Sequence, residues 1–393
     1  MFNNNKKFMT FGKMPIANNF LDKENFKDEF FFDMDIAFNE KYSLFMLSNH
    51  PTPSQMFNQN YKFFSSSSLF MNEHFLNFAN KLKKGLSNKS NKIIEIGCND
   101  GIMLKNFEKN KFNAIGFEPS KNVANIAKKK GLNIINDFFS SSNTKAKNFL
   151  SDTSLIYAAN VICHIPNLDE LISSIDQFLH REGIFVFEEP YLGSMFEKIS
   201  YDQIYDEHVY IFSVHSILKI FKEFNFDLYN VEQQKTHGGS MRYFICRKSR
   251  REISKNVEKY LNYEKEKNID NLSSCLKFKE KCEVSKNYLI EKLSSFKKQG
   301  RLVAGYAATS KSTTVLNYCN ISEDLIKCIY DTTPNKINKF SPGMHIPIID
   351  HKEFKQNYPD VAYLFAWNHK EEIFKKEKEF INNGGEWFSH VKL

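Results

Sequence analysis

From residue 92 onward, short apolar runs alternate with amphipathic runs, and this alternation constrains the fold more than any other feature of the chain. The apolar runs are predicted strands and cover residues 92–98, 113–119, 132–137, 154–160 and 183–190. The amphipathic runs are predicted helices and cover residues 101–110, 120–131, 167–183 and 214–226. Nearly continuous Val, Ile and Phe strands separated by helices indicate a parallel sheet covered on both faces. Two further strands, 227–234 and 240–248, are predicted to close this sheet as an antiparallel hairpin.

The rest of the chain divides into three parts. A stretch rich in Glu and Lys is predicted to form one or two long helices that end at Gly300, and a second, smaller α/β series begins after it. The first 90 residues hold short strand-like pieces and a predicted helix over 68–86. We therefore expect an α/β protein made of an N-terminal module (1–75), a Rossmann-like domain (76–250), a helical linker (251–299) and a C-terminal Rossmann-like domain (300–393).

The composition excludes several classes of protein. Hydrophobic residues make up 41% of the 393 residues, so the chain is not disordered. It has no run of about 20 apolar residues, and its start, MFNNNKKFMT, lacks the apolar middle of a signal peptide, so we expect a cytoplasmic protein without membrane association. The net charge of +8 is spread along helical patterns, which favours anionic small molecules over nucleic acid as ligands.

The cysteines give no sign of a structural site. Seven of them are scattered along the chain without a C-x-x-C pair, which argues against a disulfide framework and against a zinc site. They are Cys98, Cys163, Cys246, Cys275, Cys282, Cys319 and Cys328.

The segment IIEIGCNDG (93–101) lies where a buried strand turns toward a helix. Glycines at such a turn let the backbone approach a ligand closely. Glu118 ends the next strand, 118 − 97 = 21 residues after Gly97, where an acid can accept both hydroxyls of an adenosine ribose. The pattern E-x-G-x-x-x-G resembles the loop that binds S-adenosylmethionine. The candidate cofactor-binding residues are Glu95, Gly97, Asn99 and Gly101 in this loop and Glu118, Asp137 and Asn160 at the ends of the following strands.

A group of ionisable residues follows the fifth predicted strand. The segment YDQIYDEH (201–208) offers a phenol at Tyr205, a carboxylate at Glu207 and an imidazole at His208. Ligands of open α/β sheets bind beyond the carboxyl ends of the strands, so we expect this segment over the reactive end of the cofactor. His164, after the fourth strand, approaches the same place.

The chain resembles the sugar C-methyltransferases of bacterial deoxysugar pathways over most of its length. The motifs that carry the resemblance are GKMPIANNF (12–20), IEIGCNDG (94–101), GFEPS (116–120), NVICHIPNL (160–168), YDQIYDEH (201–208), HGGSMR (237–242), KSTTVLNYCNI (311–321), PGMHIPI (342–348) and AWNHKEEI (366–373). The resemblance implies a class I methyltransferase fold, S-adenosylmethionine as cofactor and a nucleotide-linked 4-keto-6-deoxy sugar as substrate, methylated at C3.

The resemblance also implies a mechanism in which a base removes the C3 proton and the resulting enolate attacks the methyl group. We expect His208 to be the base and Tyr205 to donate a hydrogen bond to the enolate oxygen. Glu207 is expected to orient the imidazole or to anchor the sugar, and His164 is the alternative base. An imidazole is a weak base for such a proton, so enolate stabilisation must share the work.

The N-terminal part departs from the family. Members begin with a small zinc domain whose two cysteine pairs flank the MPIANNF-like stretch, but no cysteine precedes Cys98 here. The second pair would fall at Phe38 and Lys41, so we expect no zinc and apolar packing in its place. A family stretch that carries tyrosines to the active site corresponds to NYKFFSSSS, in which Phe63 takes one tyrosine position and Tyr61 remains the candidate for substrate binding.

The C-terminal domain contains GYAATSKST (305–313), which nearly spells a Walker loop but has Ser310 in place of the glycine before Lys311. This replacement argues against nucleotide hydrolysis. A loop leading to a helix start can still hold phosphate, so we expect Lys311 to contact the pyrophosphate of the sugar nucleotide, with a plain packing role as the alternative.

Two other functions stay open from the sequence. One is an O- or N-methyltransferase acting on a nucleotide sugar, and the other is a catalytically silent family member that binds a sugar nucleotide. The sequence does not define the sugar, the nucleotide or the oligomeric state.

Overall fold

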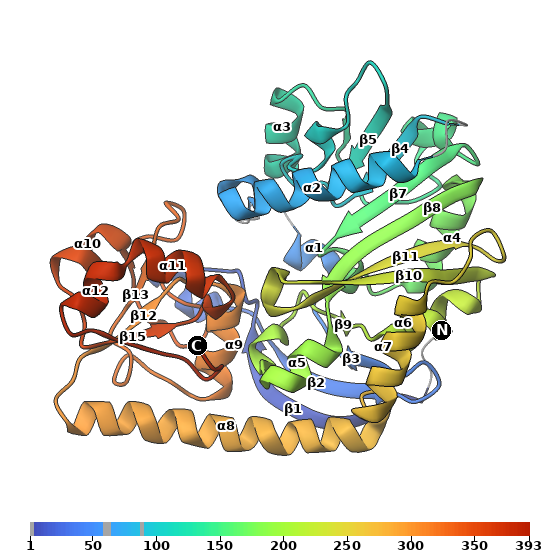
Figure 1. Ribbon diagram of the computed structural model, residues 1–393. Helices are drawn as coiled ribbons and strands as arrows, with labels where there is room; N and C mark the ends of the chain where they lie inside the picture. Colours follow the sequence, from blue (N-terminus) through green and yellow to red (C-terminus); the bar gives the residue numbers. More distant parts are fainter. Residues whose placement is uncertain (1–3, 58–63, 87–89) are drawn as a thin grey trace.

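The computed structural model describes residues 4–57, 64–86 and 90–393. Figure 1 shows two α/β lobes, an N-terminal sheet beneath the central lobe and a long helix that runs along the base. The long helix is α8 (Leu272–Lys298), which follows the shorter α7 (Lys255–Glu266) and leads into the C-terminal lobe. The expectation of one or two long helices before Gly300 is confirmed.

The central lobe is built on a seven-stranded sheet in the order β10-β11-β8-β7-β4-β5-β6. The strands are β4 (Lys92–Ile96), β5 (Asn113–Phe117), β6 (Ile134–Ile135), β7 (Thr153–Ala159), β8 (Leu179–Pro190), β10 (Phe226–Gln234) and β11 (Ser240–Arg247). The strands from β4 to β8 pair in parallel, whereas β11 is antiparallel to both β8 and β10. The predicted parallel sheet and its closing hairpin are therefore confirmed.

Helices cover both faces of this sheet. They are α2 (Leu69–Gly85), α3 (Lys121–Lys129), α4 (Leu168–Phe178) and α6 (Val214–Lys222). The short α5 (Leu192–Lys198) instead packs in the core of the N-terminal sheet. On one face, Phe78 of α2 packs in a core with Ile93 and Leu155 of the sheet. On the other face, Ile172 of α4 and Ile217 of α6 pack in a second core. Because both faces are covered, the strands are apolar throughout.

The predicted helix over 101–110 is wrong. The chain there forms turns and a short 3₁₀ helix, Leu104–Asn106. Ile102, Met103 and Leu104 are consecutive and all buried. One face of an α-helix cannot bury three successive side chains equally, since neighbours along a helix point about 100° apart. Tight turns place all three side chains against the core.

The C-terminal lobe is a five-stranded parallel sheet in the order β14-β13-β12-β15-β16. Its strands are β12 (Val303–Tyr306), β13 (Ile329–Asp331), β14 (Ile348–Asp350), β15 (Val361–Leu364) and β16 (Glu386–Phe388). Its helices are α9 (Ser310–Tyr318), α10 (His351–Gln356), α11 (Lys370–Lys376) and α12 (Lys378–Asn382). The carboxyl ends of these strands face the central lobe through the cavity described below.

The N-terminal sheet is antiparallel and has the order β1-β2-β3-β9. It comprises β1 (Lys6–Pro15), β2 (Phe31–Asn39) and β3 (Leu44–Leu47), with β9 (Tyr210–Ile211) contributed from the central part of the chain; the short α1 (Pro53–Met56) follows. Phe38 is fully buried in the core of this sheet, whereas the ammonium of Lys41 pairs with Glu223. Because β9 comes directly after the segment 201–208, this sheet supports the predicted reactive segment.

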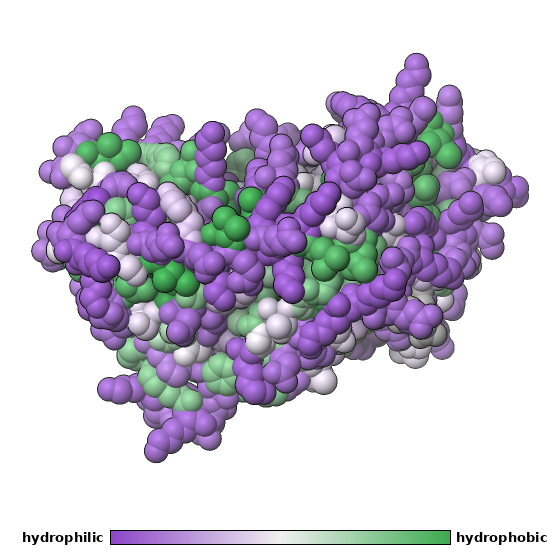
Figure 2. Space-filling view, turned by 90° about the horizontal axis from the view of Figure 1, so that it is seen from below, coloured by the Kyte–Doolittle hydropathy of each residue, from purple (hydrophilic) through white to green (hydrophobic). Residues whose placement is uncertain are grey.

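The face of the molecule below the N-terminal sheet and α8 is largely hydrophilic. Figure 2 shows the face seen from below as mostly polar, with hydrophobic side chains in separate patches. Exposed apolar side chains of α8 include Leu276, Val284 and Tyr288. In the part of the chain that the structure describes, no helix is both long and apolar enough to cross a membrane.

Candidate active site

A cavity of about 500 Å³ lies between the carboxyl edge of the central sheet and the C-terminal lobe. Three parts of the chain line it: Asn18 comes from the loop after β1, Asn160 from the central lobe and Lys311 from the C-terminal lobe. Ten of the predicted site residues line it: Gly97, Asn99, Glu118, Asp137, Asn160, His164, Tyr205, Glu207, His208 and Lys311.

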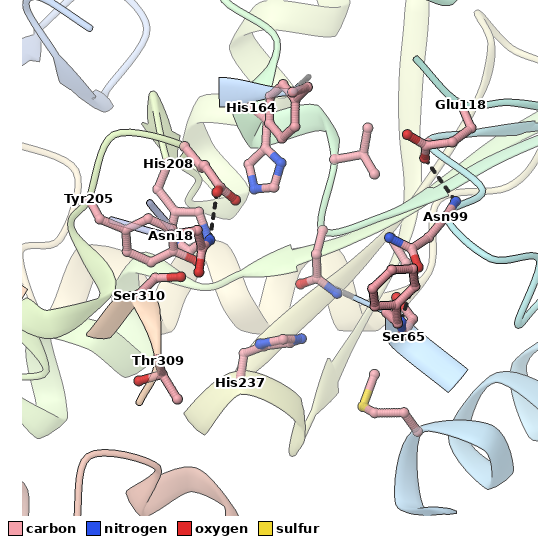
Figure 3. A pocket seen from close by; sticks show the side chains of 18 of the residues that line it. Asn18, Ser65, Asn99, Glu118, His164, Tyr205, His208, His237, Thr309 and Ser310 are labelled. Atoms are coloured by element: carbon pink, nitrogen blue, oxygen red, sulfur yellow. Dashed lines mark hydrogen bonds between the residues drawn. The ribbon is translucent and has the colours of Figure 1, made fainter. Parts of the chain in front are cut away.

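The predicted cofactor loop forms one end of the cavity (Figure 3). Glu118, at the end of β5, accepts backbone N–H bonds from Asn99 at 3.0 Å and from Ser120 at 2.8 Å. Burial raises the pKa of the Glu118 carboxyl above its usual value. The side-chain oxygen of Asn99 in turn accepts the backbone N–H of Ser65 at 3.0 Å. The acid at the strand end thus fixes the loop and stays at the cavity wall as a hydrogen-bond acceptor.

The shape and chemistry of this end fit an adenosine-containing cofactor. Gly97 has a positive φ of 65°, and a Cβ there would lie 2.5 Å from a methyl group of Val161, so only glycine allows this close backbone approach. The side-chain oxygen of Asn160 is buried, and no hydrogen-bond partner for it exists among the described residues. Asp137, also at the wall, accepts the side-chain amide of Asn143 at 3.0 Å. An unsatisfied acceptor beside a glycine cradle suits the amino and hydroxyl groups of such a ligand.

Three predicted residues do not line the described cavity wall. Glu95 lies behind the loop, where its carboxyl accepts the hydroxyl of Tyr157 at 2.7 Å and burial raises its pKa to about 8. Gly101 has a φ of 79° and forms the turn, with a would-be Cβ 2.1 Å from Leu132. Tyr61 falls outside the residues that the structure describes.

Two adjacent glutamates at the end of β8 hold the surrounding loops. Glu188 is fully buried and accepts bonds from His74 at 2.9 Å, Thr236 at 2.8 Å and Arg242 at 2.7 Å. Burial alone would raise the pKa of Glu188, but the His74 hydrogen bond and the Arg242 charge lower it to about 2. Burial raises the pKa of its neighbour Glu189 to about 7. The first carboxylate therefore stays charged and ties α2 to the hairpin strand β11.

The imidazole of His208 is held by two partners. Its Nδ1 lies 2.6 Å from the carbonyl oxygen of Gln203, and its Nε2 lies 2.7 Å from the hydroxyl of Tyr205. A carbonyl oxygen only accepts, so Nδ1 carries the proton of the neutral ring and Nε2 accepts from the Tyr205 hydroxyl. Burial, with a further contribution from His164, lowers the pKa of His208 well below its usual value. His208 is thus an uncharged imidazole whose one ring lone pair, on Nε2, accepts a hydrogen bond from the Tyr205 hydroxyl.

His164 lies beside this pair. Its ring stacks on that of His208 with centroids 5.4 Å apart, and burial lowers its pKa to about 3. Its Nε2 is buried, with no hydrogen-bond partner among the described residues. Cys163, His164 and His208 place possible metal-ligand atoms within 4.8 Å of one another. Both ring nitrogens of His208 already have partners, however, so this group does not form a ready metal site.

The N-terminal loop reaches the carboxylates of the reactive segment. The side-chain amide of Asn18 donates to Glu207 at 2.6 Å, and the backbone N–H of Ala17 donates to Asp206 at 2.9 Å. Burial and the charge of Glu207 raise the pKa of Asp206 to about 8. Because Gln203 and Tyr205 already occupy the nitrogens of His208, the geometry favours the anchoring role of Glu207 over the orienting one.

The C-terminal lobe contributes a cation. Lys311, in the first turn of α9, is 8% exposed; its ammonium donates to the side chain of Asn368 at 2.9 Å and lies 4.7 Å from the ring centre of Trp367. Burial lowers the pKa of Lys311 to about 8, partly offset by the charge of Asp202. Burial, followed by the Lys311 charge, also lowers the pKa of His369 at the same wall. This end of the cavity is therefore suited to an anion.

Sequence reasoning gave no role to several residues at the cavity wall. They are Asn18, His237, Lys336, Asn368 and His369. Four of them lie within motifs that carry the family resemblance, and only Lys336 does not. A signal was therefore present, but nothing in the local pattern indicates that these side chains line the cavity. The two glycines after His237 are the clearest local signal, because paired glycines often mark an unusual backbone.

Comparisons with known proteins agree with this architecture. A methyltransferase domain model matches residues 71–231, and the model of the C-methyltransferase C-terminal domain matches residues 235–391. The C-methyltransferase NovU of Streptomyces niveus is 27% identical over 384 residues, covering 96% of this chain and 90% of that protein.

Two solved structures are similar to less than half of this chain. The PH0226 protein of Pyrococcus horikoshii OT3 has a TM-score of 0.38 and 13% identity, over 48% of this chain and 95% of that chain. The plantazolicin methyltransferase BpumL, in complex with SAH, has a TM-score of 0.34 and 14% identity, over 44% of this chain and 82% of that chain.

The predicted fold class is confirmed by the methyltransferase domain model and by the strand order of the central sheet. The prediction of a methyltransferase that uses S-adenosylmethionine is confirmed as well. The chain is thus an S-adenosylmethionine-dependent methyltransferase that carries the C-terminal domain of the C-methyltransferases.

Proposed function

We propose that the enzyme methylates C3 of a nucleotide-linked 4-keto-6-deoxy sugar. The observation that carries this proposal is the hydrogen-bonded pair of half-buried Tyr205 and buried His208, in the cavity that the predicted cofactor loop also lines. A phenol and a neutral imidazole in contact can take a proton from carbon. Transfer to an oxygen or nitrogen needs no acidic C–H bond. The match to the C-methyltransferase domain model supports the same choice.

The side chains suggest the path of the proton. The Nε2 lone pair of His208 is the final acceptor, since it accepts the Tyr205 hydroxyl, and both residues line the cavity. The carbon-bound proton passes to the phenol oxygen while the phenol proton passes to Nε2. The electron pair of the C–H bond enters the enolate, and the bound cofactor supplies an electrophilic methyl group. Because burial lowers the pKa of His208, this transfer needs an enolate that is itself stabilised.

Two other residues are proposed to hold the substrate. Glu207, fixed by Asn18, accepts a hydroxyl of the sugar or its nucleoside. Lys311, which lines the same cavity, pairs with the diphosphate. An anion next to Lys311 stabilises the charged ammonium, so binding offsets part of the cost of burying that cation.

Solvent exchange tests the proposal. We expect the enzyme, incubated in deuterated buffer with a panel of freshly prepared dTDP- and GDP-linked 4-keto-6-deoxy sugars, to exchange the C3 proton of one of them and to methylate that carbon. His208→Asn should lower both rates by about 100-fold or more, since general base catalysis contributes typically 10²–10⁴-fold. His180→Asn, outside the cavity, is the control and should retain both rates.

Mass spectrometry and NMR give the readout. A product carrying its new methyl group on oxygen or nitrogen, or normal exchange by His208→Asn, would contradict the proposal.

A further inference from the structure

The hydrogen bond between Tyr205 and His208 leaves one task of the proposed reaction without a residue. The phenol proton is directed at Nε2 of His208, so the same proton cannot also serve the ketone oxygen of the substrate. That oxygen gains negative charge when the neighbouring carbon loses its proton. An oxyanion in a buried site needs a hydrogen-bond donor aimed at it. The donor must come from another part of the wall.

His237 reaches into the cavity from the side opposite His164 (Figure 3). Among the described residues, no side chain or backbone group is hydrogen-bonded to its imidazole. Burial, followed by the charges of its basic neighbours Lys311 and His369, lowers the pKa of His237 to about 3. The ring is therefore uncharged at neutral pH and keeps one N–H to donate. A neutral donor can stabilise an enolate without simply giving up its proton to it.

The backbone of His237 is strained, and its surroundings hold it in that state. Its φ and ψ are 52° and 22°, in the left-handed region that non-glycine residues rarely adopt. Gly238 and Gly239 follow with positive φ, and a Cβ at Gly238 would lie 2.1 Å from the ring of Trp367. Strain of this kind persists when the structure around it fixes it, and it is common at functional sites.

Gln203 is hydrogen-bonded to the backbone of His237 and to the imidazole of His208. Its side-chain amide donates to the backbone carbonyl of His237, and its own carbonyl accepts Nδ1 of His208. One residue therefore sets both the position of the strained turn and the tautomer of the proposed base.

We propose that His237 is a further catalytic residue, whose uncharged imidazole donates an N–H to the ketone oxygen of the substrate while the neighbouring carbon is deprotonated. The C–H electron pair enters the carbon–carbon bond of the enolate, the carbonyl π pair moves to the oxygen, and the proton ends on His208. This inference rests on the proposed function.

Two substitutions at position 237 separate the donor from the backbone. His237→Gly keeps the left-handed turn and removes the donor, whereas His237→Asn keeps an N–H on a residue that tolerates this conformation. With the keto sugar that the wild-type enzyme methylates, we expect His237→Gly to lower C3 exchange at saturating sugar by about 100-fold or more. His237→Asn should lose less, and added imidazole should restore part of the rate of His237→Gly.

The controls separate this inference from the function on which it rests. Unchanged S-adenosylmethionine affinity and melting temperature of both variants show an intact fold. A wild-type enzyme that neither exchanges nor methylates any keto sugar would refute the proposed function. Normal exchange at saturating sugar in His237→Gly, or an effect confined to KM, would instead overturn the role of His237 alone.

Discussion

Two strand-loop units, one in each lobe, face the same cavity and are built alike. In the central lobe, Glu118 at the end of the second strand accepts the loop N–H of Asn99 at 3.0 Å and the N–H of Ser120 at 2.8 Å. In the C-terminal lobe, Asp331 accepts the loop N–H of Ala308 at 2.7 Å and the N–H of Thr333, two residues after it, at 2.7 Å. Each acid thus fixes the loop that precedes it.

The two units differ in what the loop presents. The central loop uses glycine at its positive φ, with 65° at Gly97, whereas the C-terminal loop uses Ala307 at 71°. The central loop runs into turns, whereas the C-terminal loop opens α9, with Lys311 in its first turn. The same scaffold therefore offers close backbone approach in one lobe and a cation in the other. This difference favours close backbone contacts with the cofactor in the central lobe and a contact between the Lys311 ammonium and an anionic substrate in the C-terminal lobe.

The largest expected effect comes from the glycine. Gly97→Ala should raise the Kd for S-adenosylmethionine by about 100-fold, because a non-glycine residue in this conformation costs about 1–2 kcal/mol and overpacking against Val161 adds about 1–3 kcal/mol. Calorimetric titration measures this. Ala307→Gly at the corresponding place in the other loop is the control and should leave that Kd unchanged. If Gly97→Ala and the wild type bound S-adenosylmethionine with equal affinity, the proposed difference between the two loops would be wrong.

Substitution of Glu118 should weaken binding of the cofactor alone, and substitution of Asp331 should weaken binding of the sugar nucleotide alone. Glu118→Gln should weaken S-adenosylmethionine binding by about tenfold, because a hydrogen bond to a charged group contributes about 1.5–3 kcal/mol and the amide keeps part of it. Asp331→Asn should leave S-adenosylmethionine binding unchanged and raise KM for the sugar nucleotide by a similar factor. Each variant is measured with both ligands. If Asp331→Asn weakened cofactor binding as much as Glu118→Gln, the lobes would not be separate in function.

The smallest effect is a pH dependence confined to the C-terminal lobe. The pKa of Lys311 is lowered to about 8, so the cation is present below that pH and is lost as the pH rises through it. The affinity for a nucleoside diphosphate should therefore fall by up to about tenfold per pH unit above pH 8. Titrations at several pH values measure this.

Lys311→Met is the matched control. It should bind the diphosphate weakly and show a flat profile in the same pH range. A wild-type affinity independent of pH from 7 to about 9.5 would contradict the assignment of Lys311 to the anion.

Much of the central lobe follows from local patterns in the sequence. Alternating strand and helix periods predicted the parallel sheet, and the residues that end strands, such as Glu118 and Asn160, do line the cavity. The prediction of a helix over 101–110 was wrong because three successive apolar residues, Ile102 to Leu104, are all buried at a turn. Glu95 lies behind the cavity, since alternate residues of a strand point to opposite faces and its carboxyl bonds Tyr157.

The sequence by itself determined the fold class, the glycine-containing turn after β4 and the concentration of ionisable groups in 201–208. Only the tertiary structure decided which groups meet. Asn18 lies 189 positions before Glu207, yet it donates a hydrogen bond to it. His237 lies 34 positions after Gln203, yet its backbone carbonyl accepts the side-chain amide of Gln203. The physical reason is that strand and helix periods report on neighbours along the chain, whereas packing of apolar faces brings distant residues together.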